Sequence, residues 1–383
     1  MKSFYKDVTD CTPAYVFDID AFASRIKRVA QKLAGIPLCY SIKANPFLVK
    51  YLPEEITHLE VCSPGELKIC EATGVDLSRI IFSGVNKTAE NVKNAMDDNV
   101  GIFTAESLLH LQLINDYAVE CGKKVQLILR LSCGNQFGMD EADIESIIAE
   151  KDKYAGTDIV GIHYYAGTQK KKAVFIKKEL ETLDKFLQTL CDKFGFIPSM
   201  VEYGPGMAVE YFGDDPETTD MLLLDEVSVL LNEFKEKYPL SVEIGRFFAA
   251  DCGTYFTKIA DTKVIHDINY AICDGGIHHL KYYGQTMSMQ IPPVEVLNPV
   301  DDENKFWSVC GSLCTVADVL VRKVELCGAG EGCVLAFGRC GAYSVTEGSV
   351  LFLSRQMPKI YIFSDELGLI QVRDTLESFK INM

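Results

Sequence analysis

The sequence lacks any long hydrophobic run. No apolar segment approaches the roughly 20 residues that a membrane-spanning helix requires, and the opening residues, MKSFYKDVTDC, contain no apolar stretch typical of a secretion signal. From these two absences we expect a cytoplasmic protein that does not contact a membrane.

Basic residues are scarce relative to acidic ones. The chain has 38 Lys and Arg against 54 Asp and Glu, which gives a formal net charge of -16. A surface of this sign repels the phosphates of nucleic acid. We therefore expect no nucleic-acid partner.

Paired cysteines are also missing. The 14 cysteines include no C-x-x-C pair and no spacing typical of zinc ligands, so we expect reduced thiols and no metal. No G-x-G-x-x-G follows an early strand-like run, which argues against a dehydrogenase that binds NAD.

Short apolar runs that alternate with helical patterns are abundant. Eight runs read as strands: PLCYSIKA, HLEVCS, IIFSG, GIFTA, VQLILRLS, IVGIHYYAG, SMVEYGPG and LSVEIGR. Segments such as PGELKICEATG and KKELETLDKFLQTLCDKFG lie between them and repeat apolar residues at helical spacing. Eight alternating units predict an α/β fold with a closed parallel (β/α)8 barrel.

The sequence after about residue 255 has a different pattern. Its strand-like runs follow one another with little room for long helices, which indicates a mostly antiparallel β-domain. The early segment TPAYVFDI reads as a further strand of this domain, so both chain ends would contribute to it. We expect a barrel over residues 20–258 and a β-domain over 1–19 and 259–383.

Polar residues interrupt the barrel runs near their C-terminal ends, the face on which barrel enzymes carry their active sites. They are Lys43, Ser63, Ser83, Thr104, Ser132, His163, Glu243 and Arg246. A lysine in this position either extends to water or supplies a desolvated amine for a Schiff base. The agreement among the strand ends favours the second interpretation for Lys43.

Other motifs have two readings when taken singly. Gly204 and Gly206 of EYGPGM suit a phosphate-binding loop or a plain turn. Glu243 and Arg246 suit a ring nitrogen and a phosphate, or a structural ion pair at the barrel rim. His163 alone is more typical of a satisfied core residue.

Taken together, these motifs resemble those of the fold type III pyridoxal-phosphate (PLP) decarboxylases, the ornithine/diaminopimelate decarboxylase family. YSIKANP is similar to the family's PLP-lysine motif, and EVCSPGEL to its second-strand motif. GIHYYAGTQ, EIGRFFAA, GSLCTVAD and GAY resemble its histidine, Glu-Pro-Gly-Arg, catalytic-cysteine and phosphate-tyrosine motifs, with Ile244 in place of the proline. Their order and spacing match over nearly the whole chain.

The resemblance implies an alanine-racemase-like barrel, PLP as cofactor, and a homodimer with shared active sites. It implies a Schiff base on Lys43, stacking of His163 on the cofactor ring, and pairing of Glu243 with the ring nitrogen. It further implies that Cys314 reprotonates the substrate carbon. The residues implied to hold the phosphate are Gly204, Gly206, Arg246 and Tyr343. An amino-acid racemase on the same fold is the alternative, although Glu243 and Cys314 favour loss of CO2.

The substrate-facing positions depart from the resemblance. Thr315 follows Cys314 where diamine-forming enzymes have an acidic residue, and CDGGIHHLKYYGQ supplies His278, His279 and Lys281 in place of an Arg-Pro pair. We therefore expect a diaminopimelate-like, carrier-linked or otherwise conjugated amino acid rather than a simple diamine precursor. Diaminopimelate decarboxylase proper remains an alternative.

A basic cluster follows the histidine strand. It contains Lys170, Lys171 and Lys172, with Lys177 and Lys178 seven residues on. One hypothesis is that this cluster receives an anionic partner such as an acidic carrier protein. The other interpretation is a solvated helix start.

Overall fold

The computed structural model describes residues 4–383, and they divide into two compact units. One unit comprises residues up to Ser24, Glu210–Pro216 and Phe248–Met383, and the other comprises Arg25–Val209 and Glu217–Phe247. The second unit is called the barrel below, and the first the β-domain. The domain boundaries expected from the sequence, at residues 20 and 258, stay a prediction.

Eight parallel strands close the barrel in chain order, so the predicted fold is confirmed. They are β2 (Leu38–Ser41), β3 (Ile56–Val61), β4 (Ile80–Phe82), β5 (Ile102–Ala105), β6 (Val125–Leu131), β7 (Thr157–Tyr165), β8 (Met200–Gly204) and β9 (Leu240–Ile244). Each coincides with one of the eight strand-like runs. The barrel closes where β2 pairs with β9, with Cys39 opposite Glu243.

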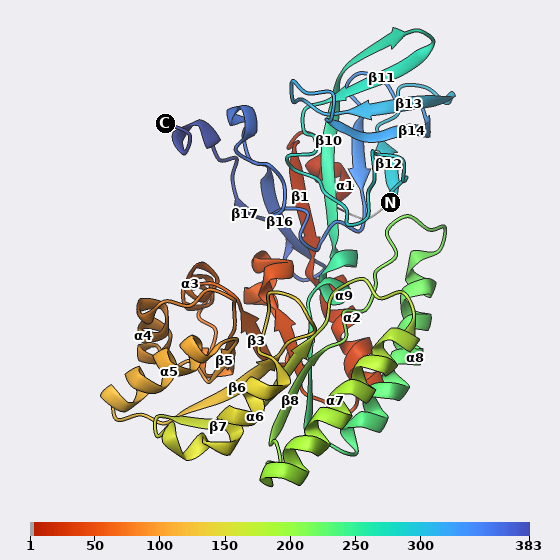
Figure 1. Ribbon diagram of the computed structural model, residues 1–383. Coiled ribbons are helices and arrows are strands. Elements are labelled where there is room, and N and C mark those ends of the chain that lie inside the picture. Colours follow the sequence, from red (N-terminus) through yellow and green to blue (C-terminus); the bar gives the residue numbers. More distant parts are fainter. Residues whose placement is uncertain (1–3) are drawn as a thin grey trace. The chain divides into compact units, whose positions relative to one another are not determined.

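Helices surround the barrel strands (Figure 1). They are α2 (Ile19–Lys32), α3 (Pro64–Thr73), α4 (Ala89–Asp97), α5 (Leu108–Glu120), α6 (Glu141–Ala149), α7 (Ala173–Phe194), α8 (Pro216–Lys235) and α9 (Arg246–Ala249). Their starts follow the side-chain chemistry of helix caps: Ser63 accepts a bond from the Glu66 amide, and Thr88 and Asn91 form a reciprocal capping box. The helices bury apolar stripes, so the strands beneath them are buried on both faces.

A nine-stranded sheet forms the core of the β-domain, with the order β14-β13-β11-β10-β1-β16-β17 and with β15 joining β10 to β12. The strands are β1 (Ala14–Asp18), β10 (Gly253–Ile265), β11 (Ile268–Cys273), β12 (Val294–Leu297), β13 (Asn304–Cys310), β14 (Val319–Cys327), β15 (Val334–Phe337), β16 (Lys359–Ser364) and β17 (Gly368–Arg373). The short helix α1 (Tyr5–Val8) packs in the same core.

The sheet confirms that both chain ends build this domain. β1 lies between β10, to which it is antiparallel, and β16, to which it is parallel. Most other pairings are antiparallel, with β11 and β13 a second parallel pair. Two strands, β12 and β17, were not predicted from the sequence. Within residues 4–383, no helix is both long enough and apolar enough to cross a membrane.

Candidate active site

Lys43 lies just beyond the carboxyl end of β2. The strand ends at Ser41, and Lys43 occupies a single 3-10 turn, Ile42–Ala44, rather than the strand itself. Pro46 disfavours a helical conformation at the residue before it, and Asn45 is extended accordingly, with its side chain accepting the Phe47 amide at 3.0 Å. The 3-10 turn therefore ends at Ala44 and holds Lys43 at the barrel mouth.

The Lys43 ammonium contacts three side chains inside the barrel mouth. It donates a hydrogen bond to Glu60, lies 3.3 Å from Oε1 of Glu243 and lies 3.6 Å from Sγ of Cys62. The thiol of Cys62 donates in turn to Glu60 at 3.0 Å. Burial, followed by the Glu60 carboxylate, raises the pKa of the Cys62 thiol well above its usual value. Lys43 therefore lies between two carboxylates, beside a thiol that stays protonated.

Glu243, at the end of β9, joins Lys43 to His163. The Ser41 hydroxyl donates to Oε1 of Glu243 at 2.6 Å, and Nε2 of His163 lies 3.3 Å from Oε2. Burial alone would raise the pKa of Glu243, but the charge of Lys43 and the contact with His163 outweigh it and hold the pKa well below its usual value. Glu243 is therefore a buried, ionised carboxylate.

His163 is buried on β7, opposite Glu202 on β8. Within the described part of the chain, neither of its ring nitrogens has a hydrogen-bond partner, although Nε2 faces Glu243. A satisfied core histidine would have such partners. The polar edge of the ring thus lies beside the Glu243 carboxylate at the barrel mouth.

The glycine loop after β8 is closely packed. A Cβ atom on Gly204 would lie 2.5 Å from the Tyr165 ring, and one on Gly206 would lie 1.9 Å from the Gly167 carbonyl oxygen. Gly206 also has a φ of +59°. Both positions therefore require glycine, and the backbone passes close to the loop that follows β7.

Arg246 begins α9, directly after β9. Its Nε donates to the Thr168 hydroxyl at 3.4 Å, and its side chain is buried. Thr168 belongs to the loop after β7, which itself contacts the glycine loop through Gly167. The three C-terminal strands of the barrel thus bring Arg246 and the two glycines close to the loop after β7, and their role in holding a phosphate stays a prediction.

Lys170 is not part of an exposed basic cluster. Its ammonium lies 2.9 Å from the Glu179 carboxylate and donates to the Pro205 carbonyl at 3.1 Å, and its side chain is only 10% exposed. Its backbone amide donates to the Gly206 carbonyl at 2.9 Å. Lys170 therefore braces the glycine loop. Lys170 is therefore not available to bind an anionic partner as the hypothesis requires. Lys171 and Lys172 are exposed.

Several polar residues of the mouth were not identified as site residues from the sequence. Glu60 and Cys62 lie beside Lys43, as described above. Lys87, in the loop after β4, is a buried lysine whose ammonium donates to the Gly84 carbonyl at 2.6 Å. Burial lowers the pKa of Lys87 to about 8. A buried side chain with a perturbed pKa at a barrel mouth is a recognisable signal, but it requires the structure.

Cys314 and Thr315 lie on an exposed turn of the β-domain. Asp318 fixes this turn by accepting from the amide of Leu313 at 2.6 Å and from that of Ile277 at 2.8 Å. The neighbouring segment 277–281 is therefore tied directly to the Cys314 turn. The Cys314 side chain itself is exposed, and Val316 at the tip is 98% exposed.

His278 and His279 are buried inside the β-domain, with ring centroids 3.8 Å apart. Nε2 of His279 faces the Gln356 carbonyl at 2.8 Å and must donate to it, so Nδ1 accepts from the Tyr255 hydroxyl at 3.1 Å. Burial lowers the pKa of His279 to about 3. These contacts give His279 a packing role in the domain.

Lys281 and Tyr343 occupy two adjoining loops. Lys281 is exposed and lies 3.2 Å from Glu347, while the Ser344 hydroxyl donates to the Lys281 carbonyl. Tyr343 has a φ of +65°, and its carbonyl accepts the amides of Thr346 and Glu347, both at 2.9 Å. The loop that carries Tyr343 is thus bonded through Ser344 to the backbone of Lys281.

Comparison with known proteins identifies related chains. Residues 19–250 match the family described as "Pyridoxal-dependent decarboxylase, pyridoxal binding domain". The chain is 25% identical to a diaminopimelate decarboxylase of Aquifex aeolicus, covering 96% of this chain and 90% of that one. It is also 25% identical to an L-glutamyl-[BtrI acyl-carrier protein] decarboxylase of Niallia circulans, covering 91% and 87%.

Solved structures show the same fold. A diaminopimelate decarboxylase from Helicobacter pylori, complexed with L-lysine, superimposes with a TM-score of 0.87 at 20% identity and covers 98% of each chain. The structure of AQ1208 from Aquifex aeolicus gives a TM-score of 0.86 at 23% identity and covers 98% of this chain and 93% of that one.

Proposed function

From the premise that the chain belongs to the pyridoxal-dependent decarboxylase family, we propose that Lys43 holds pyridoxal 5'-phosphate and that the enzyme removes the α-carboxylate of an amino acid. The observation that carries the proposal is the group formed by Lys43, Glu243 and His163 at the barrel mouth. It combines an amine, an ionised carboxylate and a flat ring without hydrogen-bond partners.

The residues present fit this cofactor. The buried ring nitrogens of His163, which have no hydrogen-bond partner among the described residues, favour a bound group at the mouth. Pyridoxal phosphate supplies an electron sink for the electron pair left when CO2 departs. Lys43 would attach the cofactor covalently, and Gly204, Gly206 and Arg246 would hold its phosphate together with Tyr343.

Glu243 would keep a proton on the pyridine nitrogen. Its low pKa makes it an anion at neutral pH, and a buried anion stabilises a cationic partner more strongly than one in water does. His163 would pack its ring against the cofactor. Glu60 would serve as the carboxylate partner of the Lys43 amine whenever that amine is not attached to the cofactor.

Cys314 would return a proton to the substrate carbon after CO2 has left. Its turn is exposed and belongs to the β-domain, so the proposal includes a homodimer in which Cys314 serves the site of the partner subunit. The proposed substrate is a diaminopimelate-like, carrier-linked or conjugated amino acid. Thr315, which is neutral, supports this because it provides no counter-charge for a bare distal ammonium.

The first experiment is an absorption spectrum of the purified protein before and after borohydride, followed by mass mapping of the reduced adduct. A band near ~420 nm and an adduct on Lys43 are expected. Lys87 is the internal competitor, because its pKa of about 8 leaves more of its amine neutral at pH 7 than an ordinary lysine has. An adduct on Lys87, or no band after addition of pyridoxal phosphate, would refute the assignment.

The second experiment tests decarboxylation itself. CO2 release is measured over free and carrier-linked amino acids, and the product is analysed for Cys314→Ala beside a matched control, Cys310→Ala, at the end of β13. We expect the Cys314 variant to slow or misdirect protonation and the Cys310 variant to behave as the wild type. Interconversion of enantiomers without CO2 would indicate a racemase instead.

A further inference from the structure

The barrel has a pocket at the amino ends of its strands, opposite the mouth that carries Lys43. Its volume is about 470 Å3, and a second pocket of about 570 Å3 adjoins it. Both volumes fall in the range of small-ligand sites. The strand residues that line the first pocket include His58, Ile102, Gln126, Val160, Met200 and Ser241, of which the first three also line the second. Every lining residue of both pockets belongs to the barrel.

The wall of the first pocket ends in buried polar groups. Ser241, which lines it, is only 3% exposed and lies in register with Glu202 on β8. Burial raises the pKa of Glu202 to about 8, and the nearby Ser241 hydroxyl opposes this rise. Within residues 4–383, however, neither that hydroxyl nor the Glu202 carboxyl oxygens make a hydrogen bond of normal geometry. Buried polar groups normally have such bonds, so the Ser241 hydroxyl is available to a group held in the pocket.

The charged side chains that line the two pockets are all lysines: Lys123, Lys124 and Lys235. No Asp or Glu of the described residues lines either pocket, in a chain whose formal net charge is -16. His58, which the two pockets share, has its pKa lowered by burial and then by the charge of Arg79. The amino ends of the barrel strands therefore present a positive patch on an acidic protein.

Two of the lysines are fixed in place without being neutralised. Nζ of Lys235 donates to the Ala34 carbonyl at 3.0 Å, and Nζ of Lys123 donates to a main-chain carbonyl at 2.7 Å and to the Asn99 amide oxygen at 3.2 Å. The carboxylate of Glu236 is 3.9 Å from Lys235, but its side chain is 77% exposed, so the pair is weak. An ammonium has three N–H donors, and each lysine therefore keeps at least one for a ligand.

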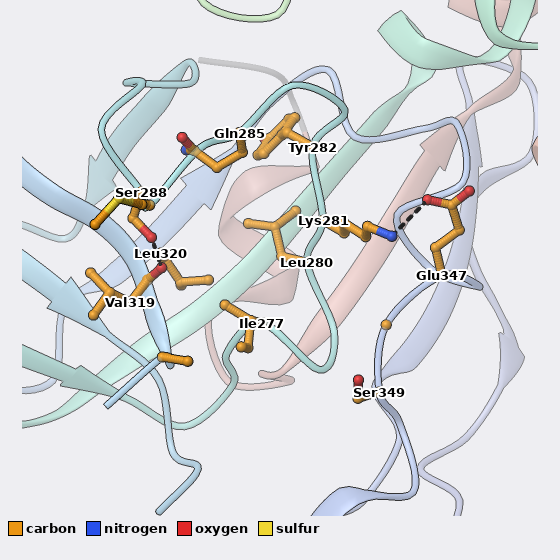
Figure 2. Close-up of a pocket in the computed structure, with 13 residues that line it drawn as sticks. Ile277, Leu280, Lys281, Tyr282, Gln285, Ser288, Val319, Leu320, Glu347 and Ser349 are labelled. Carbon is orange, nitrogen blue, oxygen red and sulfur yellow. Dashed lines mark hydrogen bonds and ion pairs between the residues drawn. The ribbon is translucent and has the colours of Figure 1, made fainter. Parts of the chain in front are cut away.

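The cavity of the β-domain drawn in Figure 2 has a different charge balance. Its lysine, Lys281, is paired with Glu347 at 3.2 Å, as the dashed line marks. That cavity therefore has no excess charge to attract an ion. The barrel pockets combine space, an available buried hydroxyl and lysines that are held by uncharged groups.

We propose that the pocket at the amino ends of the barrel strands binds a small organic anion. Its phosphate or carboxylate groups would meet the three lysines, since an ammonium attracts either group as a point charge. Its body would lie against Ile102, Val160 and Met200 and reach the Ser241 hydroxyl. The inference goes beyond the proposed function and does not depend on it, because none of these residues contacts Lys43 or its partners.

The test is calorimetry on the full chain saturated with pyridoxal phosphate, in a buffer without phosphate. Saturation fills the proposed cofactor site, so that a second anion reports on a different one. The probes are glycerol 3-phosphate, glutarate, uncharged glycerol and the dication putrescine. We expect at least one anion to bind with a dissociation constant of about 1 mM or lower, and glycerol and putrescine not to bind. Whichever anion binds more tightly distinguishes a phosphorylated ligand from a dicarboxylate.

Substitution then assigns the binding to this pocket. Lys124→Glu, at an exposed lysine, and Lys235→Met should each raise the dissociation constant of the anion about fivefold or more. The matched control is Lys153→Met, which removes a barrel lysine that is 67% exposed and paired with Glu150, and it should leave the constant unchanged. Hydrogen exchange of residues 235–241 should slow when the anion binds.

The inference is overturned if neither anion binds at 10 mM, or if the control weakens binding as much as the two pocket variants do. The outcomes also separate it from the proposed function. A borohydride adduct on Lys43 without anion binding removes only the pocket assignment. Anion binding that depends on Lys124 and Lys235, without an adduct on Lys43, removes only the cofactor assignment.

Discussion

Nζ of Lys43 lies 3.3 Å from a carboxylate oxygen of Glu243, although 200 positions separate the two residues in the chain. Barrel closure brings them together, because β2 and β9 are neighbouring strands whose carboxyl ends meet at one mouth. The contact places the amine of Lys43, whose side chain is 35% exposed, against a buried anion. This is the relationship from which the proposed cofactor chemistry follows.

Glu243→Gln tests the role of that anion. The amide has the same shape but no charge, so it cannot keep a proton on a bound pyridine nitrogen, and kcat for CO2 release should fall by about 100-fold or more. Cofactor content should change little because Lys43 is retained. The control is Ser41→Ala, which removes the 2.6 Å hydrogen bond to the same carboxylate but leaves its charge. Wild-type kcat in Glu243→Gln would rule out the role.

Lys170→Met tests whether Lys170 braces the glycine loop. The substitution removes a charged hydrogen bond to the Pro205 carbonyl, and a bond of this kind contributes about 1.5–3 kcal/mol. The dissociation constant for pyridoxal phosphate, measured by absorbance titration of the stripped enzyme, should rise by about tenfold or more. Lys172→Met, at an exposed lysine two positions on, should leave it unchanged. Equal constants for the two variants would contradict the bracing role.

The barrel could be predicted because each of its strands is a short apolar run next to a helical pattern. Such strands are buried on both faces, so local composition alone reveals them. Lys43, His163, Glu243 and Arg246 were found by the same logic, since a polar residue at the end of a buried strand is conspicuous. Their convergence then follows from barrel geometry.

The rest depends on contacts that local sequence does not contain. Glu60 reads as one polar residue in a strand, and only its pairing opposite Ser41 shows that it lies beside Lys43. Lys170 was predicted as part of a solvated cluster, but pairing between its segment and Met207 turns it inward. β12 has only four residues, one of them buried, and β17 has no fully buried residue, so neither is a buried apolar run of the kind that marks the other strands.

The roles assigned to individual site residues remain predictions, because a motif does not show which groups a side chain faces in the fold. His279 shows why: its sequence neighbourhood suggested a substrate contact, whereas its ring bonds to Tyr255 and to the Gln356 carbonyl. A motif supplies the residue type, and long-range packing decides which groups that residue faces. Lys281, three residues further from the DGG turn than His278, is the one whose side chain is exposed.

Asp318→Asn tests how the Cys314 turn is fixed. The carboxylate accepts two backbone amides, whereas an asparagine side chain has one acceptor oxygen and would point an N–H group at the other amide. The close approach of Gly311 leaves no space to adjust, because a Cβ atom there would lie 2.3 Å from the carboxylate. We expect a loss of about 1–3 kcal/mol in local stability and a lower kcat.

Hydrogen exchange of residues 311–318 and cofactor absorbance provide the readouts for that variant. Exchange of the turn should accelerate while the amount of bound pyridoxal phosphate is unchanged, since Lys43 belongs to the barrel. Asp301→Asn is the matched control, because this exposed carboxylate also accepts a backbone amide, that of Glu303 at 2.9 Å. Unchanged exchange in Asp318→Asn would refute the fixing role.

Glu202 should make stability fall as pH rises. It is fully buried on β8, and burial, aided by the nearby charge of Glu243, raises its pKa to about 8. The folded protein therefore keeps this proton between about pH 4.5 and 8, whereas the unfolded chain releases it. Its contribution to stability is complete below the unfolded pKa and is lost as pH rises through the folded pKa.

Glu202→Gln stays neutral at every pH, so it removes this dependence. Relative to the wild type, its free energy of unfolding in urea should rise by about 4 kcal/mol between pH 5 and pH 8, since one pKa unit corresponds to about 1.4 kcal/mol. The control is Glu236→Gln, at a glutamate whose side chain is 77% exposed, which should follow the wild-type curve. Parallel curves for Glu202→Gln and the wild type would show that Glu202 is ionised in the folded barrel.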